Sequence, residues 1–243
     1  MFFNTMKTRM ISAAAAGAIV AGLGAGAALA APAVVVKSSA NKYPVGSKVD
    51  DTKTITLASG DSVTVLTKKG TRTMKGPGTF KVGDKPKSNR ARFANLTRTR
   101  AASRTATGAV RSAAVETSER PLSPNLYYVD VAKSGTMCLT NMQQVRLWRP
   151  FNAGIETYTV TAAGSDTSVD VTFDDGESVA PLDPALMAIT EGGSYTVSGP
   201  EGSEAATVTF ASLDQSYRAA DALATALIDK GCMVQLTLLG EKL

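Results

Sequence analysis

The chain has 243 residues, of which 26 are Lys or Arg and 21 are Asp or Glu, so its formal net charge is +5 at pH 7. It contains no histidine, which excludes Ser-His and Cys-His nucleophile pairs, histidine metal sites and histidine pH switches. The net charge is small and does not by itself indicate a nucleic-acid partner.

The first 30 residues have the pattern of a secretory signal peptide. Lys7 and Arg9 form a positively charged region, residues 11–29 are apolar, and Ala28 and Ala30 are small residues at the positions that a signal peptidase recognises. No second apolar run of membrane-spanning length follows. We therefore expect cleavage after Ala30 and export to the periplasm or out of the cell, and an uncleaved membrane anchor is the alternative.

Between residues 54 and 82, apolar and polar residues alternate, and the turn sequences ASGD, KKG and KGPG separate the alternating runs. This pattern predicts a small antiparallel meander with one apolar face. Gly60-Asp61-Ser62 also matches the motif of a class of serine hydrolases. Because no histidine is available to deprotonate Ser62, which lies in the polar phase of a strand, we interpret the motif as a turn followed by a strand hydroxyl.

The stretch ITLASGDSVTVLTKKGTRTMKGPGTFKVG, residues 55–83, resembles the FecR-like β domain. That family pairs a Gly-Asp turn and a valine-rich strand with a later Gly-Pro-Gly turn. The stretch is also similar to exported proteins from Gram-negative bacteria that join such a segment to a second β-rich domain. FecR signal transducers carry in addition a cytoplasmic anti-sigma region and a membrane helix, whereas here we expect a cleavable leader. The resemblance implies a β-rich periplasmic interaction domain without catalytic residues over residues 31–83.

Residues 84–124 form a basic segment, in which residues 84–120 contain nine Lys or Arg against three acidic residues. Phe93 and Leu96 could lie on a short helix, and we interpret the segment as a linker between two β-rich units. Arginine binds carboxylates and phosphates through paired hydrogen bonds, so an acidic partner or an anionic surface is the functional interpretation. The alternative is a solvated flexible linker.

Nucleic acid is not an expected partner of this segment, because Phe93 is the only aromatic residue among its arginines. The candidate partner-binding arginines are Arg92, Arg98, Arg100 and Arg104.

From residue 125 to residue 243, short runs rich in β-branched and aromatic residues alternate with turn signals. The runs are LYYVDVA, TMCLTN, QVRLWRP, ETYTVTA, SVDVTFDDGES, SYTVSGP and EAATVTFAS. Asp175-Gly176 is a candidate two-residue hairpin turn. This density of short strands predicts a sandwich or a partly open barrel.

One helix is expected in this second domain, over residues 213–230, packed on its sheet. Ser212 and Gln215 have the spacing of a capping box, and Gly231 follows where glycine often ends a helix. The sequence CMVQLTLL after the helix predicts a final apolar strand. The expected helix has apolar residues at helical spacing, namely Leu213, Tyr217, Ala220, Leu223, Ala224, Leu227 and Ile228.

The only two cysteines, Cys138 and Cys232, are expected to form a disulfide, because an even cysteine count in an exported protein indicates pairing. Neither a CxxC spacing nor other soft ligands accompany them, which argues against a redox-active or metal-binding pair. The bond would close a long loop, a constraint worth about 4–5 kcal/mol, and would tie the helix to the strand that carries Cys138.

Acidic residues cluster at Asp166, Asp170, Asp174, Asp175 and Glu177. The cluster could be a calcium loop or could supply glycosidase acids. Its spacing does not match the Asp-x-Asp-x-Asp-Gly calcium loop, so we interpret it as a solvated acidic hairpin. No metal or cofactor site is expected.

Trp148 is the only tryptophan. An exposed aromatic side chain can stack on a sugar or on a partner protein, and Arg146 would share its strand face. Core or inter-domain packing is the favoured role of Trp148, and partner binding is the alternative.

These features predict a mainly β protein of two small domains, a meander and a sandwich or partly open barrel, with one packed C-terminal helix. We expect a non-catalytic interaction or scaffold module of the cell envelope whose partner is an envelope or secreted protein. One alternative is a binder of anionic envelope polymer or polysaccharide. Another is an enzyme that depends on carboxylates alone.

Overall fold

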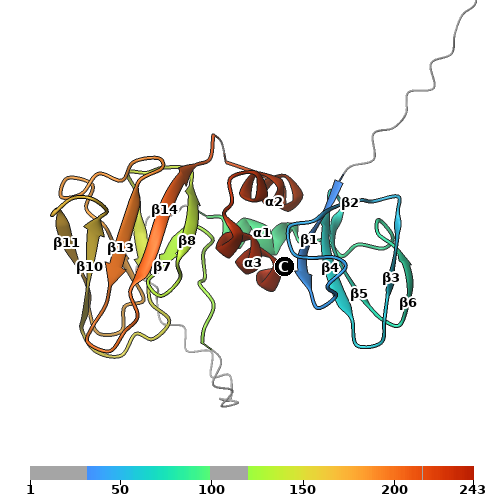
Figure 1. Ribbon diagram of the computed structural model, residues 1–243, viewed down its shortest axis with the longest axis horizontal. Helices are drawn as coiled ribbons and strands as arrows, with labels where there is room; N and C mark the ends of the chain where they lie inside the picture. The colour runs from blue at the N-terminus through green and yellow to red at the C-terminus, as the bar shows by residue number, and fades with distance from the viewer. Residues whose placement is uncertain (1–31, 99–119, 215) are drawn as a thin grey trace, which may run out of the picture.

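The computed structural model describes residues 32–98, 120–214 and 216–243 (Figure 1). The predicted mainly β class is confirmed, because these residues form fourteen strands in four sheets, none closed into a barrel, and three helices. The predicted signal peptide lies outside the described residues. In the part of the chain that is described, no helix has the length and apolarity needed to cross a membrane.

The N-terminal unit contains a four-stranded sheet of order β2-β1-β4-β5 and a two-stranded sheet of β3 and β6. In a meander each strand pairs with the next one in sequence. Here β3 pairs with β6, and the β4–β5 hairpin lies between them in sequence, so the predicted meander order is wrong. Its strands are β1 (Pro32–Ser38), β2 (Lys48–Asp50), β3 (Thr54–Leu57), β4 (Ser62–Thr67), β5 (Gly70–Lys75) and β6 (Gly78–Lys81).

The Gly60-Asp61-Ser62 motif is a turn and the start of a strand, as interpreted from the sequence. The carboxylate of Asp61 accepts a hydrogen bond from the N–H of Ala58 at 3.0 Å, which closes the turn between β3 and β4. The N–H of Ser62 donates to the hydroxyl of Ser39 at 2.8 Å.

Strand β1, which the sequence analysis did not predict, is buried on both faces. Ala33 and Val35 belong to the core of the N-terminal unit, whereas Val34 and Val36 belong to the core that continues into the C-terminal domain. A strand covered on both faces needs a continuous apolar run rather than alternation, and the sequence AVVV provides it. Strand β1 thus joins the two halves of the molecule.

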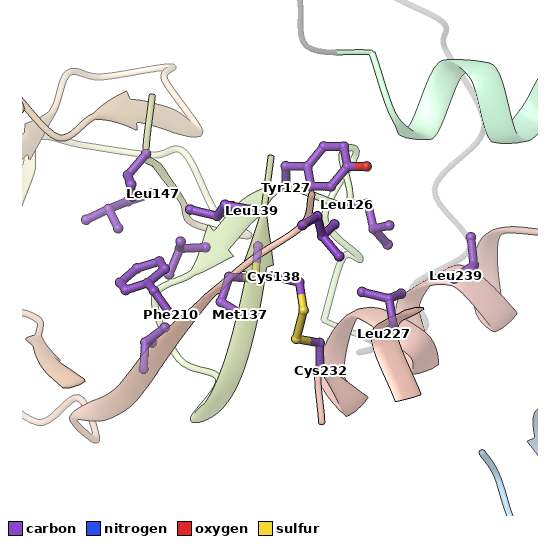
Figure 2. Packing of buried hydrophobic residues seen from close by; sticks show 14 of the residues in the cluster. Leu126, Tyr127, Met137, Cys138, Leu139, Leu147, Phe210, Leu227, Cys232 and Leu239 are labelled. Atoms are coloured by element: carbon purple, nitrogen blue, oxygen red, sulfur yellow. A yellow bond between two sulfur atoms is a disulfide. The ribbon is translucent and has the colours of Figure 1, made fainter. Parts of the chain in front are cut away.

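The C-terminal domain is a sandwich of a five-stranded sheet, β11-β10-β13-β14-β8, and a three-stranded sheet, β12-β9-β7. Apolar residues from both sheets share one core (Figure 2). The strands are β7 (Tyr128–Asp130), β8 (Gly135–Leu139), β9 (Arg146–Trp148), β10 (Glu156–Ala162), β11 (Ser168–Phe173), β12 (Val179–Pro181), β13 (Ser194–Ser198) and β14 (Ala206–Ser212).

Asp175-Gly176 forms a turn but not the predicted hairpin. Gly176 has a φ of +83°, which favours glycine. The turn carries the chain from β11 in the five-stranded sheet to β12, which pairs with β9 in the other sheet. The turn residues therefore predicted correctly that the chain turns at Asp175-Gly176. They could not predict that the strand after the turn pairs with β9, which is distant in sequence, rather than with β11.

Three helices lie between the two β units: α1 (Arg90–Leu96), α2 (Ala220–Asp229) and α3 (Met233–Lys242) (Figure 1). The predicted helix is shorter than expected, because Ser212 ends β14 and α2 has Ala219 at its N-cap without a capping side chain. Gly231 has the positive φ expected of a glycine after a helix. The short helix expected around Phe93 and Leu96 is α1, and both residues are buried.

The predicted final strand is wrong, because CMVQLTLL forms the start of α3. Its buried residues Leu236 and Leu239 are three positions apart, so they lie on one face of a helix. Gly240 allows that face to approach β1: a Cβ at Gly240 would lie 2.5 Å from the carbonyl oxygen of Val36. Helices α2 and α3 thus pack against the N-terminal sheet, and α3 also packs against β8.

The predicted disulfide is confirmed. Cys138 on β8 is bonded to Cys232 at the N-cap of α3, across 94 residues of sequence and with 5.9 Å between the Cα atoms (Figure 2). The bond ties α3 to the edge of the sandwich and so fixes one wall of the cleft described below.

Candidate functional site

Both sheets of the C-terminal sandwich end at the same cleft. Strand β8 is the last strand of the five-stranded sheet, β7 is the last of the three-stranded sheet, and α3 lies across the opening between them. The cleft encloses about 300 Å³, which is the lower end of the range typical of binding sites, roughly 300–1,000 Å³. We call it the edge cleft.

The backbone of β8 is only partly satisfied on its cleft side. The N–H of Cys138 donates to Oε1 of Gln235 at 2.6 Å, and the carbonyl of Cys138 accepts from Nε2 at 2.8 Å, so Cys138 points away from β14. Backbone groups two residues apart on a strand point to the same edge. Thr136, which lines the cleft, therefore directs its own N–H and C=O into it.

The wall that α3 contributes is apolar. Val234 and Leu238, four residues apart on one helical face, line the cleft and are half-buried. Leu122 also lines the cleft, with 48% of its surface exposed. An apolar surface of this kind loses its contact with water when a ligand covers it.

The rim of the edge cleft carries charges of both signs. Arg120 and Lys133 supply positive charge, and Asp130 and Glu241 supply negative charge. Lys37 of β1 forms an ion pair with Glu241 at 2.8 Å. Such rim charges favour orientation of a ligand over bulk affinity.

Trp148 is buried, with 3% of its surface exposed, which agrees with the favoured interpretation of core packing and leaves little of the side chain for contact with a partner. The guanidinium of Arg120 lies 5.6 Å from the centre of its ring. Arg120 also donates to both carboxylate oxygens of Asp130, with 2.6 Å between Nη1 and Oδ2. This hydrogen bonding with Asp130 raises the pKa of Arg120.

Of the four arginines predicted to bind a partner, the structure describes Arg92 and Arg98, and these two do not line a common hollow. Arg92 donates from Nη1 to the carbonyl oxygen of Leu243 at 3.3 Å. Arg98 lies just beyond α1 and lines two hollows on the surface. Arg100 and Arg104 lie outside the described residues. None of the hollows lined by Arg98 includes Arg92 or Trp148.

Arg149 is a structurally important residue that the sequence analysis missed. It is 1% exposed, and its Nε donates to the carbonyl of Glu177 at 2.8 Å. Its Nη2 donates to the carbonyls of Gly154 and Asp174, at 2.8 and 3.0 Å. Nη1 has no hydrogen bond, although it lies 3.1 Å from a carboxylate oxygen of Glu156 as an ion pair. Arg149 thus binds the loops before β10 and after β11 together.

The acidic cluster has structural contacts. The carboxylate of Asp170 accepts from the hydroxyl of Thr159 at 2.7 Å, across the β10–β11 pair. The carboxylate of Asp175 accepts from the N–H of Gly154 at 2.7 Å. Within residues 32–98, 120–214 and 216–243, no three acidic or cysteine side chains are grouped so as to hold a metal ion.

Comparisons with protein-family models, with curated protein sequences and with solved structures found no match for this chain. What the protein can bind is therefore inferred from its own surface. The edge cleft combines an apolar wall, an open strand edge and a charged rim.

Proposed function

We propose that this protein is an exported, non-catalytic interaction module that binds an extended segment of a partner protein in the edge cleft. The observation that carries the proposal is that both sheets of the sandwich end at this cleft, where the alternation of β8 directs the backbone groups of Thr136 away from β14 and no described residue pairs with them. An open strand edge is a template for a strand from another chain.

An extended peptide matches this surface better than a compact small molecule does. Its backbone would hydrogen-bond to Thr136, and alternate side chains would point towards Val234 and Leu238. The mixed charges along the rim, in which Arg120 is paired with Asp130 and Glu241 with Lys37, would set its direction and register. This is the mode of binding in which the backbone supplies affinity and pockets supply specificity.

Several observations support export and a non-catalytic role. The disulfide between Cys138 and Cys232 suits an oxidising compartment such as the periplasm or the exterior of the cell. The resemblance of residues 55–83 to the FecR-like β domain implies an interaction domain. The hydroxyl of Ser62 lies in a chain without the histidine that would activate it.

The proposal is tested by photocrosslinking in the native compartment. A photoreactive phenylalanine analogue replaces Thr237, an exposed residue of α3 that lines the edge cleft. The same analogue replaces Leu186, which is exposed elsewhere on the sandwich. We expect position 237 to crosslink one envelope or secreted protein through one short peptide, identified by mass spectrometry, and position 186 not to do so.

Two variants assign that crosslink to the cleft and to its strand edge. Leu238→Glu places a charge on the apolar wall, and Thr136→Pro removes the backbone donor on the edge of β8, where proline is tolerated. Both should abolish the crosslink while far-ultraviolet circular dichroism stays unchanged, whereas Leu186→Glu should preserve it. A crosslink that survives Leu238→Glu in a folded protein would refute the proposal.

A further inference from the structure

A second groove, separate from the edge cleft, lies beside α1 and encloses about 560 Å³. None of the residues that line it lines the edge cleft. Arg90 and Arg98, at the two ends of α1, and Arg218, just before α2, lie along it together with Phe93, Tyr127 and Tyr217. We call it the arginine groove.

The arginine groove is electrostatically one-sided. Arg90, Arg98 and Arg218 are exposed, and none of the described residues that line the groove is acidic. No ion pair joins any of the three to an acidic group in the part of the chain that the structure describes. Guanidinium groups hydrogen-bond to carboxylates and phosphates in pairs, so the groove favours an anion.

The spacing of these arginines favours a ligand with repeated charges. Helix α1 has seven residues and is therefore about 10 Å long, and Arg90 and Arg98 stand at its opposite ends. Arg98 and Tyr127 also line a smaller adjoining hollow together with Asn125, Asn141 and Gln144. A chain that carries anionic groups along its length can contact both hollows, whereas a single small anion contacts one arginine or two.

The remaining lining residues favour a saccharide over an apolar or purely ionic chain. Phe93 and Tyr127 form an aromatic floor, of which Tyr127 is 9% exposed. Burial raises the pKa of Tyr127 to about 12, so its hydroxyl stays a neutral donor. Tyr217, which is half-buried, and Ser216, which is exposed, also line the groove, and both side chains carry a hydroxyl group. Tyrosine combines an apolar ring with a polar tip, which matches the apolar faces and hydroxyl edges of sugar rings.

We propose that the arginine groove binds a saccharide chain that carries carboxylate or phosphate groups. The site consists of Arg90, Arg98 and Arg218 over the floor of Phe93 and Tyr127. Arg92, which the sequence analysis had grouped with Arg98, is not part of it. The proposal is independent of peptide binding in the edge cleft, because the two sites share no lining residue.

The test is isothermal titration calorimetry on the disulfide-bonded protein in 50 mM NaCl. Hexagalacturonate is the carboxylate probe, and an oligomannoside bearing phosphate monoesters is the phosphate probe, so the two together identify the anionic group. Neutral dextran oligomers are the control for sugar without charge. Polyphosphate and polyglutamate are the controls for charge without sugar. We expect at least one anionic saccharide to bind more tightly than all three, and its affinity to fall when the salt is raised to 300 mM.

Matched substitutions locate the site. Arg90→Gln, Arg98→Gln and Arg218→Gln should each weaken the saccharide by about fivefold or more through the loss of charge-assisted hydrogen bonds. Arg92→Gln, which changes the net charge equally, should stay within about twofold. The proposal is overturned if neither anionic saccharide binds, if polyglutamate or polyphosphate binds as tightly, or if Arg92→Gln weakens binding as much as Arg98→Gln.

Discussion

The side-chain amide of Gln235 on α3 occupies the position of a neighbouring strand for Cys138 on β8. It accepts a hydrogen bond from the backbone N–H of Cys138 and donates one to its carbonyl, at 2.6 and 2.8 Å. Its Nε2 also donates to the carbonyl of Leu126 at 3.0 Å. Gln235 is completely buried. This side chain, next to the disulfide, therefore ends the five-stranded sheet and leaves Thr136 open beyond it.

Gln235→Met should destabilise the protein strongly. The side chains have similar length, but the substitution leaves the N–H and C=O of Cys138 and the C=O of Leu126 buried with fewer partners. At about 1–3 kcal/mol for each unsatisfied group, we expect the free energy of unfolding to fall by about 3–5 kcal/mol. Urea unfolding followed by tryptophan fluorescence measures it.

The control for Gln235→Met is Gln143→Met, because Gln143 is exposed. Its effect should stay within about 0.5 kcal/mol. A loss below 1 kcal/mol for Gln235→Met would show that these three hydrogen bonds contribute little.

Gly240→Ala should also destabilise, against the usual trend for helices. Alanine is favoured over glycine inside a helix by about 1 kcal/mol. Here the added Cβ would lie 2.5 Å from the carbonyl oxygen of Val36 and would push α3 away from β1. We expect a net loss of about 1–3 kcal/mol in the free energy of unfolding, measured in urea.

Thr237→Ala, on the exposed side of the same helix, is the control for Gly240→Ala. It should be neutral or slightly stabilising. An increase in stability for Gly240→Ala would mean that α3 and β1 are not in close contact in solution.

Local patterns in the sequence predicted those elements whose signals are local. The strands of the C-terminal domain and the turn at Gly176 follow from alternation and turn chemistry. The disulfide followed from there being only two cysteines. The apolar run of α3 was assigned to a strand, because a short apolar run is compatible with a strand or with a buried helix. It forms a helix in the structure, in which Leu236 and Leu239 are buried on one face.

The edge cleft and the arginine groove could not be predicted in the same way. The cleft exists because β7 and β8, which pair in parallel with β9 and β14, end two different sheets at one place. The groove joins Arg98 to Arg218, which are far apart in the chain. The charge of the basic segment indicated an anionic ligand, but only packing separates Arg98 from Arg92.

The role of Arg149 is a third feature that the sequence could not predict, because the backbone carbonyls that it binds lie up to 28 residues away. Arg149→Met should lower the free energy of unfolding by about 3–5 kcal/mol, since it leaves several buried carbonyls and the Glu156 carboxylate without their cation. Arg149→Lys should recover only part of this loss, because lysine lacks the planar fork that reaches separate carbonyls. Urea unfolding provides both values.

Arg92→Lys is the control for the Arg149 substitutions, and we expect it to remain within about 0.5 kcal/mol of the wild type, since Arg92 is exposed. Equal stability of Arg149→Lys and the wild type would show that charge alone, without the fork geometry, holds the two loops together.

Tyr127 should make the protein lose stability at alkaline pH. Burial raises the pKa of its hydroxyl from 10.0 to about 12. Between these values the folded protein retains the proton and the unfolded chain releases it, so the free energy of unfolding falls as the pH rises, by about 1.4 kcal/mol per pH unit. Well below pH 10 this contribution is fully present, and at pH 10 half of the unfolded chains have already released the proton. Tyr127→Phe should therefore lose about 1 kcal/mol less than the wild type between pH 10 and pH 11.

Urea unfolding at pH 8, 10 and 11 tests this expectation. At pH 8 the variant and the wild type should differ little, because the described residues give the Tyr127 hydroxyl no hydrogen-bond partner. The pKa of Tyr158 is also raised, first by burial, so part of the alkaline loss should persist in Tyr127→Phe. If the two proteins lose the same stability between pH 10 and pH 11, the Tyr127 hydroxyl ionises in the folded state, and the floor of the arginine groove is open to water.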